Sequence, residues 1–273
     1  MARMVTLTRK VSFSSGHRYW IDALDEERNE RIFGRWASRC NHGHNYVLWV
    51  SAAGPVDPEN GMVVNIKWID DVLQSEVVSK FDQKSINDEV SEMSGRVPSL
   101  ENLLDSFRTK LAELPGNVQL RALKLEETPL LYGEWNSEDD MLTVTRVYEF
   151  AASHRLSVPQ LSEDENRKLF GKCTNPHGHG HNYVLEVTVT GPQDPVTGFV
   201  CDLDKLDAIV EKEIVDRYDH HNLDLDIPEL SGQNTTSEVV ATAIFNRLVG
   251  VLPWTLKRVR LFETARNVFE VSA

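Results

Sequence analysis

Positive charge, cysteine and long apolar stretches are all scarce in this chain of 273 residues. Lys and Arg number 29 against 42 Asp and Glu, which leaves a formal net charge of −13 at pH 7. Proteins that bind nucleic acids or anionic membranes usually present a basic surface, so the composition argues against both kinds of partner. No run approaches the ~18 apolar residues of a transmembrane helix, so we expect no membrane span.

The three cysteines are too few, and odd in number, to build a disulfide framework. The first residues, MARMVTLTRKVSF, lack the apolar core of a secretory signal peptide. Together these features predict a cytoplasmic protein in a reducing compartment. Hydrophobic residues at 41% and charged residues at 26% are ordinary for a globular chain, so disorder and low complexity are excluded.

The chain contains an internal repeat. The segment VSFSSGHRYW around His17 corresponds to YEFAASHRLS around His154, 137 residues later, and HGHNY recurs at the same offset. The turn GPVDP has its counterpart in GPQDP, and Glu127 matches Glu263 after one small gap. This series predicts a tandem duplication into domains 1–137 and 138–273, each of a normal size for one domain.

Each copy shows the same order of elements, which predicts an α+β fold with an antiparallel sheet. Alternating β-branched and apolar residues predict strands at 3–14, 45–53, 141–154 and 182–190. Apolar residues at helical spacing predict helices at 66–80, 99–113, 203–217 and 236–250, followed by a closing hairpin in each copy. The segments 18–41 and 155–178 are expected to be long loops, which often carry function.

Six of the nine histidines form two equivalent sets of three. In a His-x-His on a strand both side chains point to one face, because the strand period is two. A third histidine from the neighbouring antiparallel strand then completes a triad. Three imidazoles with an open fourth position are typical of a catalytic Zn²⁺ site, whereas structural sites usually have four protein ligands. The predicted metal ligands are His17, His42 and His44 in the first copy and His154, His179 and His181 in the second.

Two further features lie close to the second set in sequence. Cys173 precedes His179 by six residues, so it is either a fourth ligand, a thiolate base with a lowered pKa, or a structural thiol. The adjacent Asp219 and His220 can form an acid–base pair at the end of a predicted helix.

The second copy resembles 6-pyruvoyl-tetrahydropterin synthases over essentially all of residues 141–273. The resemblance rests on FAASHRL, LFGKCTNPHGHGHNY, GPQDPVTGFVCDLDKL, YDHHNLDLDIPEL, TTSEVVA and LFETARN. It implies two tandem T-fold (tunnelling fold) domains, each a four-stranded antiparallel sheet with two helices on one side. It also implies a homo-oligomer, in which copies join by their sheet edges into barrels and active sites lie between subunits.

The resemblance assigns roles to individual residues. It implies a Zn²⁺ ion on the second histidine set, Cys173 as general base, and Asp219 with His220 as a proton relay. Glu263 would hold the pterin ring through its 2-amino group and ring N–H, and the pterin pocket would be lined by Thr236, Ser237 and Glu238. The implied reaction converts 7,8-dihydroneopterin triphosphate into 6-pyruvoyl-tetrahydropterin with loss of triphosphate.

The first copy departs from this pattern. Trp36 and Gln83 replace the base and the relay histidine, whereas Asp82 and Glu127 are retained with the histidine set. Neither replacement can take over the proton transfer. We therefore expect the first copy to keep Zn²⁺ and, through Glu127, a pterin-like ligand, or to serve as a barrel partner. A changed reaction that uses Cys40 is the alternative.

Other functions remain open at this point. The Cys173 spacing matches the pyruvoyl enzymes, but a 6-carboxy-tetrahydropterin synthase or a folate-type enzyme that cleaves the side chain would share the scaffold. A pterin-binding protein without turnover and a structural zinc protein are the non-enzymatic alternatives. Product identity separates the enzymes from one another.

Overall fold

The computed structural model describes residues 3–273, which divide into two compact units. Unit 1 comprises the chain up to Val144 together with Gly191–Cys201, and unit 2 comprises Thr145–Thr190 and Asp202–Ala273. Unit 1 therefore includes a segment of the second sequence copy. Both units are α+β, as the sequence predicts.

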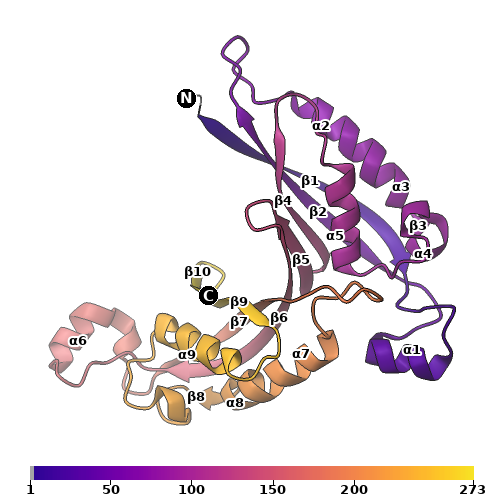
Figure 1. Ribbon diagram of the computed structural model, residues 1–273. Coiled ribbons are helices and arrows are strands. Elements are labelled where there is room, and N and C mark those ends of the chain that lie inside the picture. The colour runs from indigo at the N-terminus through magenta and orange to yellow at the C-terminus, as the bar shows by residue number, and fades with distance from the viewer. Residues whose placement is uncertain (1–2) are drawn as a thin grey trace. The chain divides into compact units, whose positions relative to one another are not determined.

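The unit 1 sheet consists of four long antiparallel strands in the order β5-β4-β2-β1 and one short addition (Figure 1). The short strand β3 has two residues and runs parallel to β1. The sequence did not predict β3, because two residues carry no periodicity. The strands are β1 (Met4–His17), β2 (His42–Pro55), β3 (Lys84–Ser85), β4 (Gln119–Thr128) and β5 (Leu131–Asn136).

The two predicted helices of unit 1 are present, but the first is interrupted by a π-helical turn at Gln74–Val78. A further helix, α1, occupies the segment expected to be a loop; Asp25 caps it, and the buried Asn29 bonds the carbonyls of Ile21 and Leu24. The helices are α1 (Glu26–Phe33), α2 (Ile66–Leu73), α3 (Ser79–Phe81), α4 (Ile86–Glu89) and α5 (Leu100–Lys110), with 3₁₀ turns at Gly34–Trp36 and Ser91–Met93.

Unit 2 repeats this plan, including the π-helical turn at Glu211–Val215 and the unexpected helix in its long loop. Its strands follow the order β10-β9-β7-β6, and the short β8 pairs in parallel with β6. The strands are β6 (Met141–His154), β7 (His179–Thr190), β8 (His221–Asn222), β9 (Thr255–Thr264) and β10 (Asn267–Ser272). The helices are α6 (Glu163–Phe170), α7 (Leu203–Val210), α8 (Asp216–Tyr218) and α9 (Ser237–Val249), with 3₁₀ turns at Gly171–Thr174 and Pro228–Leu230.

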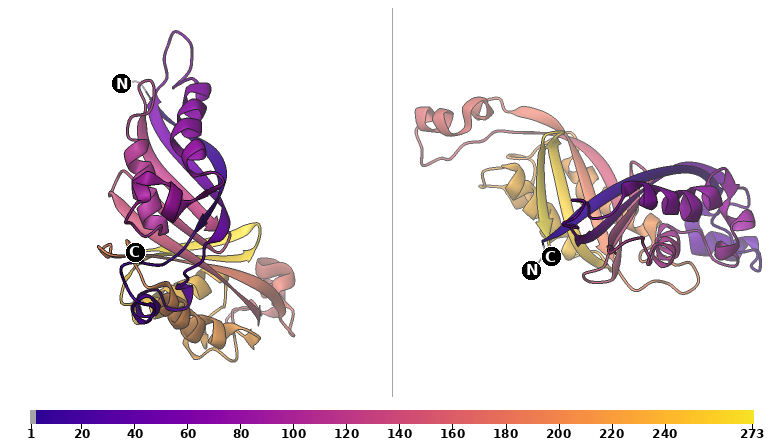
Figure 2. Two further views of the ribbon diagram at one scale, coloured as in Figure 1. Left: turned by 90° about the vertical axis from the view of Figure 1, so that its right-hand side faces the viewer. Right: turned by 90° about the horizontal axis from the view of Figure 1, so that it is seen from above.

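In each unit the longer helices pack on one face of the sheet (Figures 1 and 2). Aromatic side chains of the sheet contact aromatic side chains of the helices, Phe13 with Phe107 in unit 1 and Phe150 with Tyr218 in unit 2. Phe13 stacks on Tyr46 in unit 1, and Phe150 stacks on Tyr183 in unit 2, with ring centroids 5.1 Å apart in both pairs. Each of these buried residues lies two to four positions from a histidine of the sets. The packed core therefore holds the strand ends that carry the histidines.

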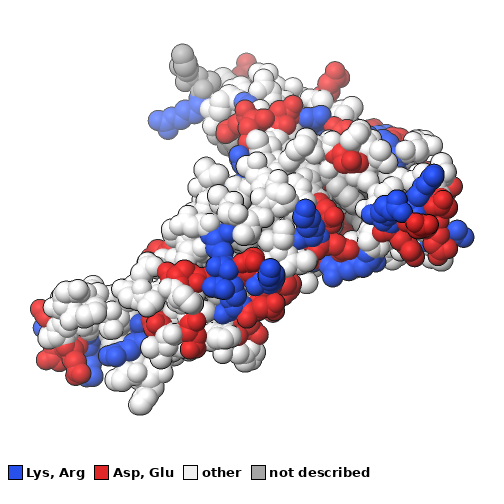
Figure 3. All heavy atoms as spheres, turned by 60° about the horizontal axis from the view of Figure 1, so that its bottom comes forward, with Lys and Arg blue, Asp and Glu red and all other residues white. Residues whose placement is uncertain are grey.

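The surface agrees with the composition. On the face that Figure 3 shows, Lys and Arg side chains lie among Asp and Glu side chains rather than forming one continuous basic patch. Many of them form ion pairs, such as Arg18 with Asp88 and Arg217 with Glu229, both at 2.7–2.8 Å. None of the helices in residues 3–273 combines the length and the hydropathy needed to cross a bilayer.

Candidate functional site

Strand pairing brings the first histidine set together at one end of the unit 1 sheet. His17 at the end of β1 lies opposite His42 at the start of β2. His44, two residues further along β2, shares the face of His42 because strand side chains alternate. One ring nitrogen from each histidine lies within 4.8 Å of the others. Unit 1 thus contains the predicted triad, which we call the first triad.

Unit 2 forms the equivalent second triad. His154 ends β6, His179 and His181 begin β7, and their ligand nitrogens also lie within 4.8 Å of one another. The Nε2 atoms of His154 and His179 are 3.2 Å apart. That spacing suits two ligands of one Zn²⁺ ion, because Zn–N bonds are ~2.0–2.1 Å long.

Backbone carbonyls orient one imidazole in each triad. Nδ1 of His17 lies 3.1 Å from the carbonyl oxygen of Pro98, and Nδ1 of His154 lies 2.8 Å from that of Thr235. A carbonyl at Nδ1 places the proton there and leaves Nε2 available to a metal. Within residues 3–273 the following buried Nε2 atoms have no hydrogen-bond partner: those of His17, His44 and His181. The donor set of both triads therefore fits Zn²⁺.

Burial favours the neutral form of these imidazoles, which is the form that binds a metal. Desolvation, with smaller effects of the neighbouring rings, lowers the pKa of His17 to about 3 and that of His44 to about 4. Desolvation also lowers the pKa of His42, His179 and His181.

The predicted acid–base pair is formed in unit 2. Nδ1 of His220 lies 2.7 Å from Oδ2 of Asp219, and the other carboxylate oxygen accepts a hydrogen bond from the amide of Ala151 on β6. These bonds, first that of the Ala151 amide and then that of His220, lower the pKa of Asp219. The ring of His220 is 83% exposed and, with His181, lines a cavity of about 660 Å³.

Cys173 lies in the 3₁₀ turn after α6 and is half-buried. Its carbonyl oxygen accepts a hydrogen bond from the amide of Leu156, which follows His154 by two residues. The turn that carries the thiol is therefore fastened to the chain beside the second triad.

Glu263 at the end of β9 lies next to the second triad. Its Oε1 is 4.0 Å from Nε2 of His154 and 3.9 Å from Nε2 of His181. The hydroxyl of Ser237 donates to Oε1 at 2.8 Å and the amide of Asn267 donates to Oε2 at 3.1 Å. Although burial opposes it, these hydrogen bonds hold the pKa of Glu263 below its ordinary value. The carboxylate is thus a charged acceptor in a fixed position.

The other predicted pocket residues lie at the start of α9. Thr236 is its N-cap residue, and Ser237 is buried. Glu238 is exposed and lines a different pocket, on the outer side of α9. The structure therefore brings Ser237 to Glu263 and leaves Glu238 on the surface of unit 2.

The equivalent positions in unit 1 keep the same backbone conformation but lack the side chains that could transfer a proton. Asp82 still accepts the amide of Ser14, and Gln83 keeps the left-handed φ of 57° that His220 has at 59°. Trp36 packs against a cluster of Tyr19, Phe33 and Val97, which Phe199 of the segment 191–201 also contacts. Cys40 is exposed. Aromatic side chains thus fill the space beside the first triad.

Sequence analysis missed the role of the segment 191–201. Its Val200 backbone amide donates a hydrogen bond to Oε1 of Glu101 at 2.8 Å. Its Thr197 carbonyl accepts one from the side-chain amide of Asn102 at 3.3 Å. Glu101 is only 2% exposed, and burial raises its pKa to about 7. No local signal reveals a contact between residues 99 positions apart. In the structure Gly198 has a positive φ and lies against Asn102, so glycine is required at this position.

Comparison with known proteins finds the same family in both copies of the sequence. A sequence model described as 6-pyruvoyl tetrahydropterin synthase matches residues 6–138 and again residues 143–273. The 6-pyruvoyl tetrahydrobiopterin synthases of Pongo abelii and Homo sapiens are each 48% identical to this chain over 126 residues, 46% of this chain and 87% of each relative. The solved 6-pyruvoyl tetrahydropterin synthase of Caenorhabditis elegans is 41% identical, with a TM-score of 0.46, over 48% of this chain and 94% of that chain. The chain therefore belongs to the 6-pyruvoyl tetrahydropterin synthase family of carbon–oxygen lyases, whose sequence it carries twice.

Proposed function

We propose that the chain is a zinc-dependent 6-pyruvoyl-tetrahydropterin synthase whose chemistry takes place in unit 2. Its substrate is 7,8-dihydroneopterin triphosphate, from which it eliminates triphosphate. The observation that carries the proposal is the combination of three features around the second triad. His220, which is paired with Asp219, lines the same cavity as His181; Glu263 lies within 4.0 Å of two triad nitrogens; and the Cys173 turn is hydrogen-bonded to the chain beside His154.

Each of these groups has a task in the reaction. Zn²⁺ held by His154, His179 and His181 would act as a Lewis acid on the substrate's side-chain hydroxyls and so acidify the adjoining C–H bonds. The thiolate of Cys173 removes a carbon-bound proton, and the Asp219–His220 pair returns a proton elsewhere on the side chain. Because the proton that is returned balances the proton that is removed, the reaction is an internal redox rearrangement of the substrate. Triphosphate is the leaving group.

Glu263 binds the pterin ring. The 2-amino group and the adjacent ring N–H are neighbouring donors, and a carboxylate accepts two parallel hydrogen bonds well. Ser237 donates to Oε1 of Glu263 and Asn267 donates to Oε2, which leaves a lone pair on each oxygen for the pterin. Thr236 and Ser237 line this part of the site. The same correspondence would give Glu127 a pterin-like ligand in unit 1.

The test is incubation of the zinc-loaded full chain with 7,8-dihydroneopterin triphosphate, with the product identified by mass. We expect triphosphate and a product with the mass of 6-pyruvoyl-tetrahydropterin, and loss of both with Cys173→Ala. A carboxy- or hydroxymethyl-pterin product would assign the chain to a rival enzyme on the same scaffold. Pterin binding without turnover would overturn the enzymatic role.

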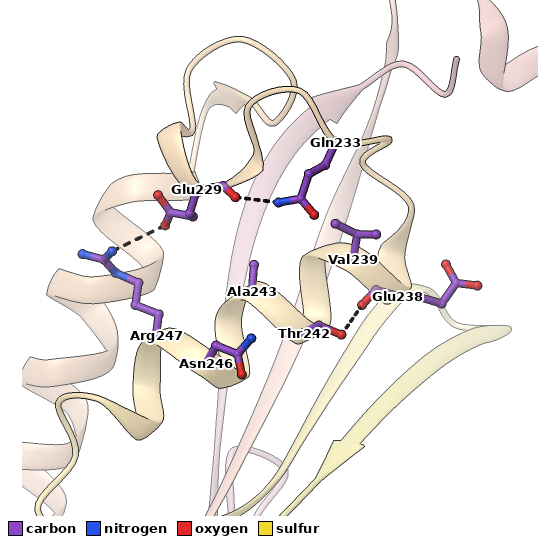
Figure 4. Close-up of a pocket in the computed structure, with 8 residues that line it drawn as sticks. All are labelled: Glu229, Gln233, Glu238, Val239, Thr242, Ala243, Asn246 and Arg247. Atoms are coloured by element: carbon purple, nitrogen blue, oxygen red, sulfur yellow. Dashed lines mark hydrogen bonds and ion pairs between the residues drawn. The ribbon is translucent and has the colours of Figure 1, made fainter. Parts of the chain in front are cut away.

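We further propose that the chain is a homo-oligomer in which one copy completes unit 2 of the next. In unit 1, residues 191–201 contact α5 at Glu101 and Asn102, which are 2% and 7% exposed. The equivalent side of α9 in unit 2 is an open pocket of about 540 Å³ (Figure 4). Glu238 and Val239 occupy the positions of Glu101 and Asn102 there.

The natural occupant of that pocket is the segment 54–64 of a second copy. It is the sequence counterpart of 191–201 and folds alike, because the Asp57 amide donates to the Met62 carbonyl as the Asp194 amide donates to that of Phe199, both at 2.8 Å. Its tip is exposed, with Met62 at 45% and nothing within 4 Å of the Cβ position of Gly61. Docking would let the Val63 amide donate a hydrogen bond to Glu238, as the Val200 amide donates to Glu101.

Thr242 lines the open pocket on α9, so Thr242→Arg should fill it without disturbing the core. We expect this variant to remain a single chain in sedimentation experiments at concentrations where the natural chain assembles. Val249, exposed on the same helix but outside the pocket lining, provides the matched control Val249→Arg. Equal masses for both variants would contradict the docking.

Two coarser features complete the proposal. We propose domains 1–137 and 138–273 as the duplicated units, with the segment 191–201 exchanged into unit 1. We also propose a cytoplasmic location, in keeping with the small and odd number of cysteines.

A further inference from the structure

Two equivalent arginines, Arg18 and Arg155, directly follow the first histidine of their triads. In unit 1 the guanidinium of Arg18 is paired with a carboxylate, because its Nη1 and Nη2 donate to the two oxygens of Asp88 at 2.7 and 2.8 Å. Nη1 also donates to the side chain of Asn41 at 3.0 Å, and a carboxylate oxygen of Asp22 lies 3.7 Å from Nη2. The positive charge of Arg18 is therefore compensated inside unit 1.

Unit 2 lacks all three of these acceptors. A leucine, a glycine and a proline occupy the equivalent positions, and none of them has a side-chain acceptor. These residues are Leu225, Gly178 and Pro159. Within residues 3–273 the side chain of Arg155 makes one hydrogen bond, from Nε to the carbonyl oxygen of Thr174 at 3.1 Å, and no ion pair. Its two terminal nitrogens therefore have no acceptor in that part of the chain.

The backbone around the two arginines is the same, so the comparison is made between equivalent positions. The backbone amide of Arg155 donates to Asp224 at 2.6 Å, as that of Arg18 donates to Asn87 at 2.9 Å. Leu225 follows Asp224 and is 83% exposed. Arg155 thus extends from the same backbone arrangement as Arg18, without the carboxylate that pairs with Arg18.

The half-buried Arg155 lines a cavity of about 650 Å³ beside the second triad. Gly178, which directly precedes His179, belongs to the same lining. His177 and Asn234 line the cavity as well, and both side chains can donate hydrogen bonds. The volume lies in the range of pockets that bind small molecules, ~300–1,000 Å³. An unpaired cation and further donors therefore meet in a cavity of suitable size.

This lining favours an anion, although the chain as a whole is negatively charged. The carboxylate of the lining, Asp224, already accepts hydrogen bonds on both oxygens, from the backbone amide of Arg155 and the hydroxyl of Thr235, each at 2.6 Å. A guanidinium presents its N–H groups in a planar fork that matches the oxygens of phosphate or carboxylate groups. Local cations of this kind are what an anionic ligand needs on an acidic protein.

We infer that this cavity binds the triphosphate of the substrate and that Arg155 is its charged contact. The inference rests on the proposed function, which places the substrate's side-chain hydroxyls at the second triad. The triphosphate is attached to the end of that same side chain, so it must lie close to the triad. Arg155 adjoins His154 and Gly178 adjoins His179, which puts the cavity at that distance. Arg155 would hold the triphosphate and compensate its charge as the C–O bond breaks and the leaving group takes the electron pair.

Calorimetry of the full, zinc-loaded chain with inorganic triphosphate tests the inference without turnover. We expect Arg155→Gln to weaken triphosphate binding by about 10–150-fold, the range for hydrogen bonds to a charged group. Its affinity for 7,8-dihydroneopterin, which has no phosphates, should be unchanged. The matched change Arg18→Gln should alter neither affinity, because Asp88 already pairs with Arg18. Undiminished triphosphate binding by Arg155→Gln, or an equal loss of dihydroneopterin binding, would overturn the inference.

A second variant keeps the guanidinium and removes its availability. Leu225→Asp offers Arg155 the partner that Asp88 gives to Arg18, at a position that is exposed and outside the core. We expect it to weaken triphosphate binding about as much as Arg155→Gln does, and unchanged binding would contradict the inference. Inorganic phosphate, measured in parallel, should bind more weakly than triphosphate. Equal affinity for both would assign the cavity to free phosphate instead of the substrate.

Turnover measurements separate this inference from the proposed function. The KM for 7,8-dihydroneopterin triphosphate should rise with Arg155→Gln by about the factor lost in triphosphate binding. Turnover by the natural chain with an unchanged KM in both variants would overturn only the role of Arg155. Absence of turnover in the natural chain, together with triphosphate binding that depends on Arg155, would overturn the proposed reaction and support the cavity as a polyphosphate site.

Discussion

Unit 1 and unit 2 share the backbone around their triads and differ in the side chains that would transfer protons. The strand pairing that places His17 opposite His42 has a counterpart in unit 2, where β6 and β7 are neighbours and His154 lies beside His179. The turn at Asp82 likewise recurs at Asp219. Trp36 and Gln83 nevertheless stand where unit 2 has its thiol and its relay histidine. The comparison teaches that metal-holding geometry depends on sheet pairing, which a duplicated fold retains. Proton transfer depends on single side chains, which can be lost one by one.

The largest expected difference between the units concerns the general base. Removing such a group typically costs 10²–10⁴-fold in rate, so Cys173→Ala should reduce triphosphate release by about that factor. The matched change in unit 1, Trp36→Ala, should change the rate less than about twofold, because no base is lost there. Steady-state assays of triphosphate release measure both. Comparable losses in the two variants would mean that unit 1 takes part in the chemistry.

The buried Glu101 should make the stability of unit 1 depend on pH. Its pKa is raised to about 7 in the folded chain, so the folded state binds this proton more tightly than the unfolded state, whose pKa is ordinary. The free energy of unfolding should therefore fall as the pH rises from about 4.5 to about 7, by up to about 3 kcal/mol. Glu101→Gln, which still accepts the Val200 amide, should remove this slope in denaturant titrations. Glu238→Gln should affect the slope only under conditions of assembly, because Glu238 is exposed in the single chain.

The paired carboxylates, Glu263 and Glu127, test which unit binds the pterin that is turned over. Hydrogen bonds to a charged group contribute about 1.5–3 kcal/mol, so Glu263→Gln should lower kcat/KM by about 10–150-fold, mainly through KM. The matched change Glu127→Gln should alter kcat/KM less than about twofold, because the proposed chemistry takes place in unit 2. Steady-state kinetics measure both variants. A comparable rise in KM with Glu127→Gln would mean that unit 1 also binds substrate that is turned over.

The smallest expected effect concerns the left-handed turns. A non-glycine residue at positive φ costs roughly 1–2 kcal/mol, and Gln83 retains this conformation without the histidine that uses it in unit 2. Gln83→Gly should raise the free energy of unfolding by about 1 kcal/mol at full activity. His220→Gly should bring a similar gain together with a large loss of turnover. A destabilised Gln83→Gly would show that the Gln83 side chain contributes to the packing of unit 1.

Much of the site is predictable from sequence because its geometry follows from short-range rules. The His-x-His spacing fixes two ligands on one strand face, and the repeat offset supplies the third. The structure brings the histidines of both sets together and contains the strands that carry them and the closing hairpins. The sequence did not predict helices α1 and α6, because these polar segments lack an apolar stripe. They are held instead by hydrogen bonds from the side-chain amides of Asn29 and Asn166.

The remaining features depend on distant partners. Ser237 donates to Glu263, 26 positions further along the chain, and that hydrogen bond forms only in the folded unit. The burial of Glu101 depends on residues 191–201, whose polar, turn-rich composition predicts an exposed loop. Local periodicity carries no information about either relation.

The exchanged segment 191–201 has a consequence for how the enzyme responds to dilution. Because it is tethered to the rest of the chain, its docking is intramolecular and its effective concentration is on the order of millimolar. Unit 1 should therefore be complete in every single chain. In the proposed assembly, unit 2 instead captures the segment 54–64 of another chain, which makes its completion a bimolecular equilibrium. Specific activity should decline as the protein is diluted below the dissociation constant of that contact, while unit 1 stays complete.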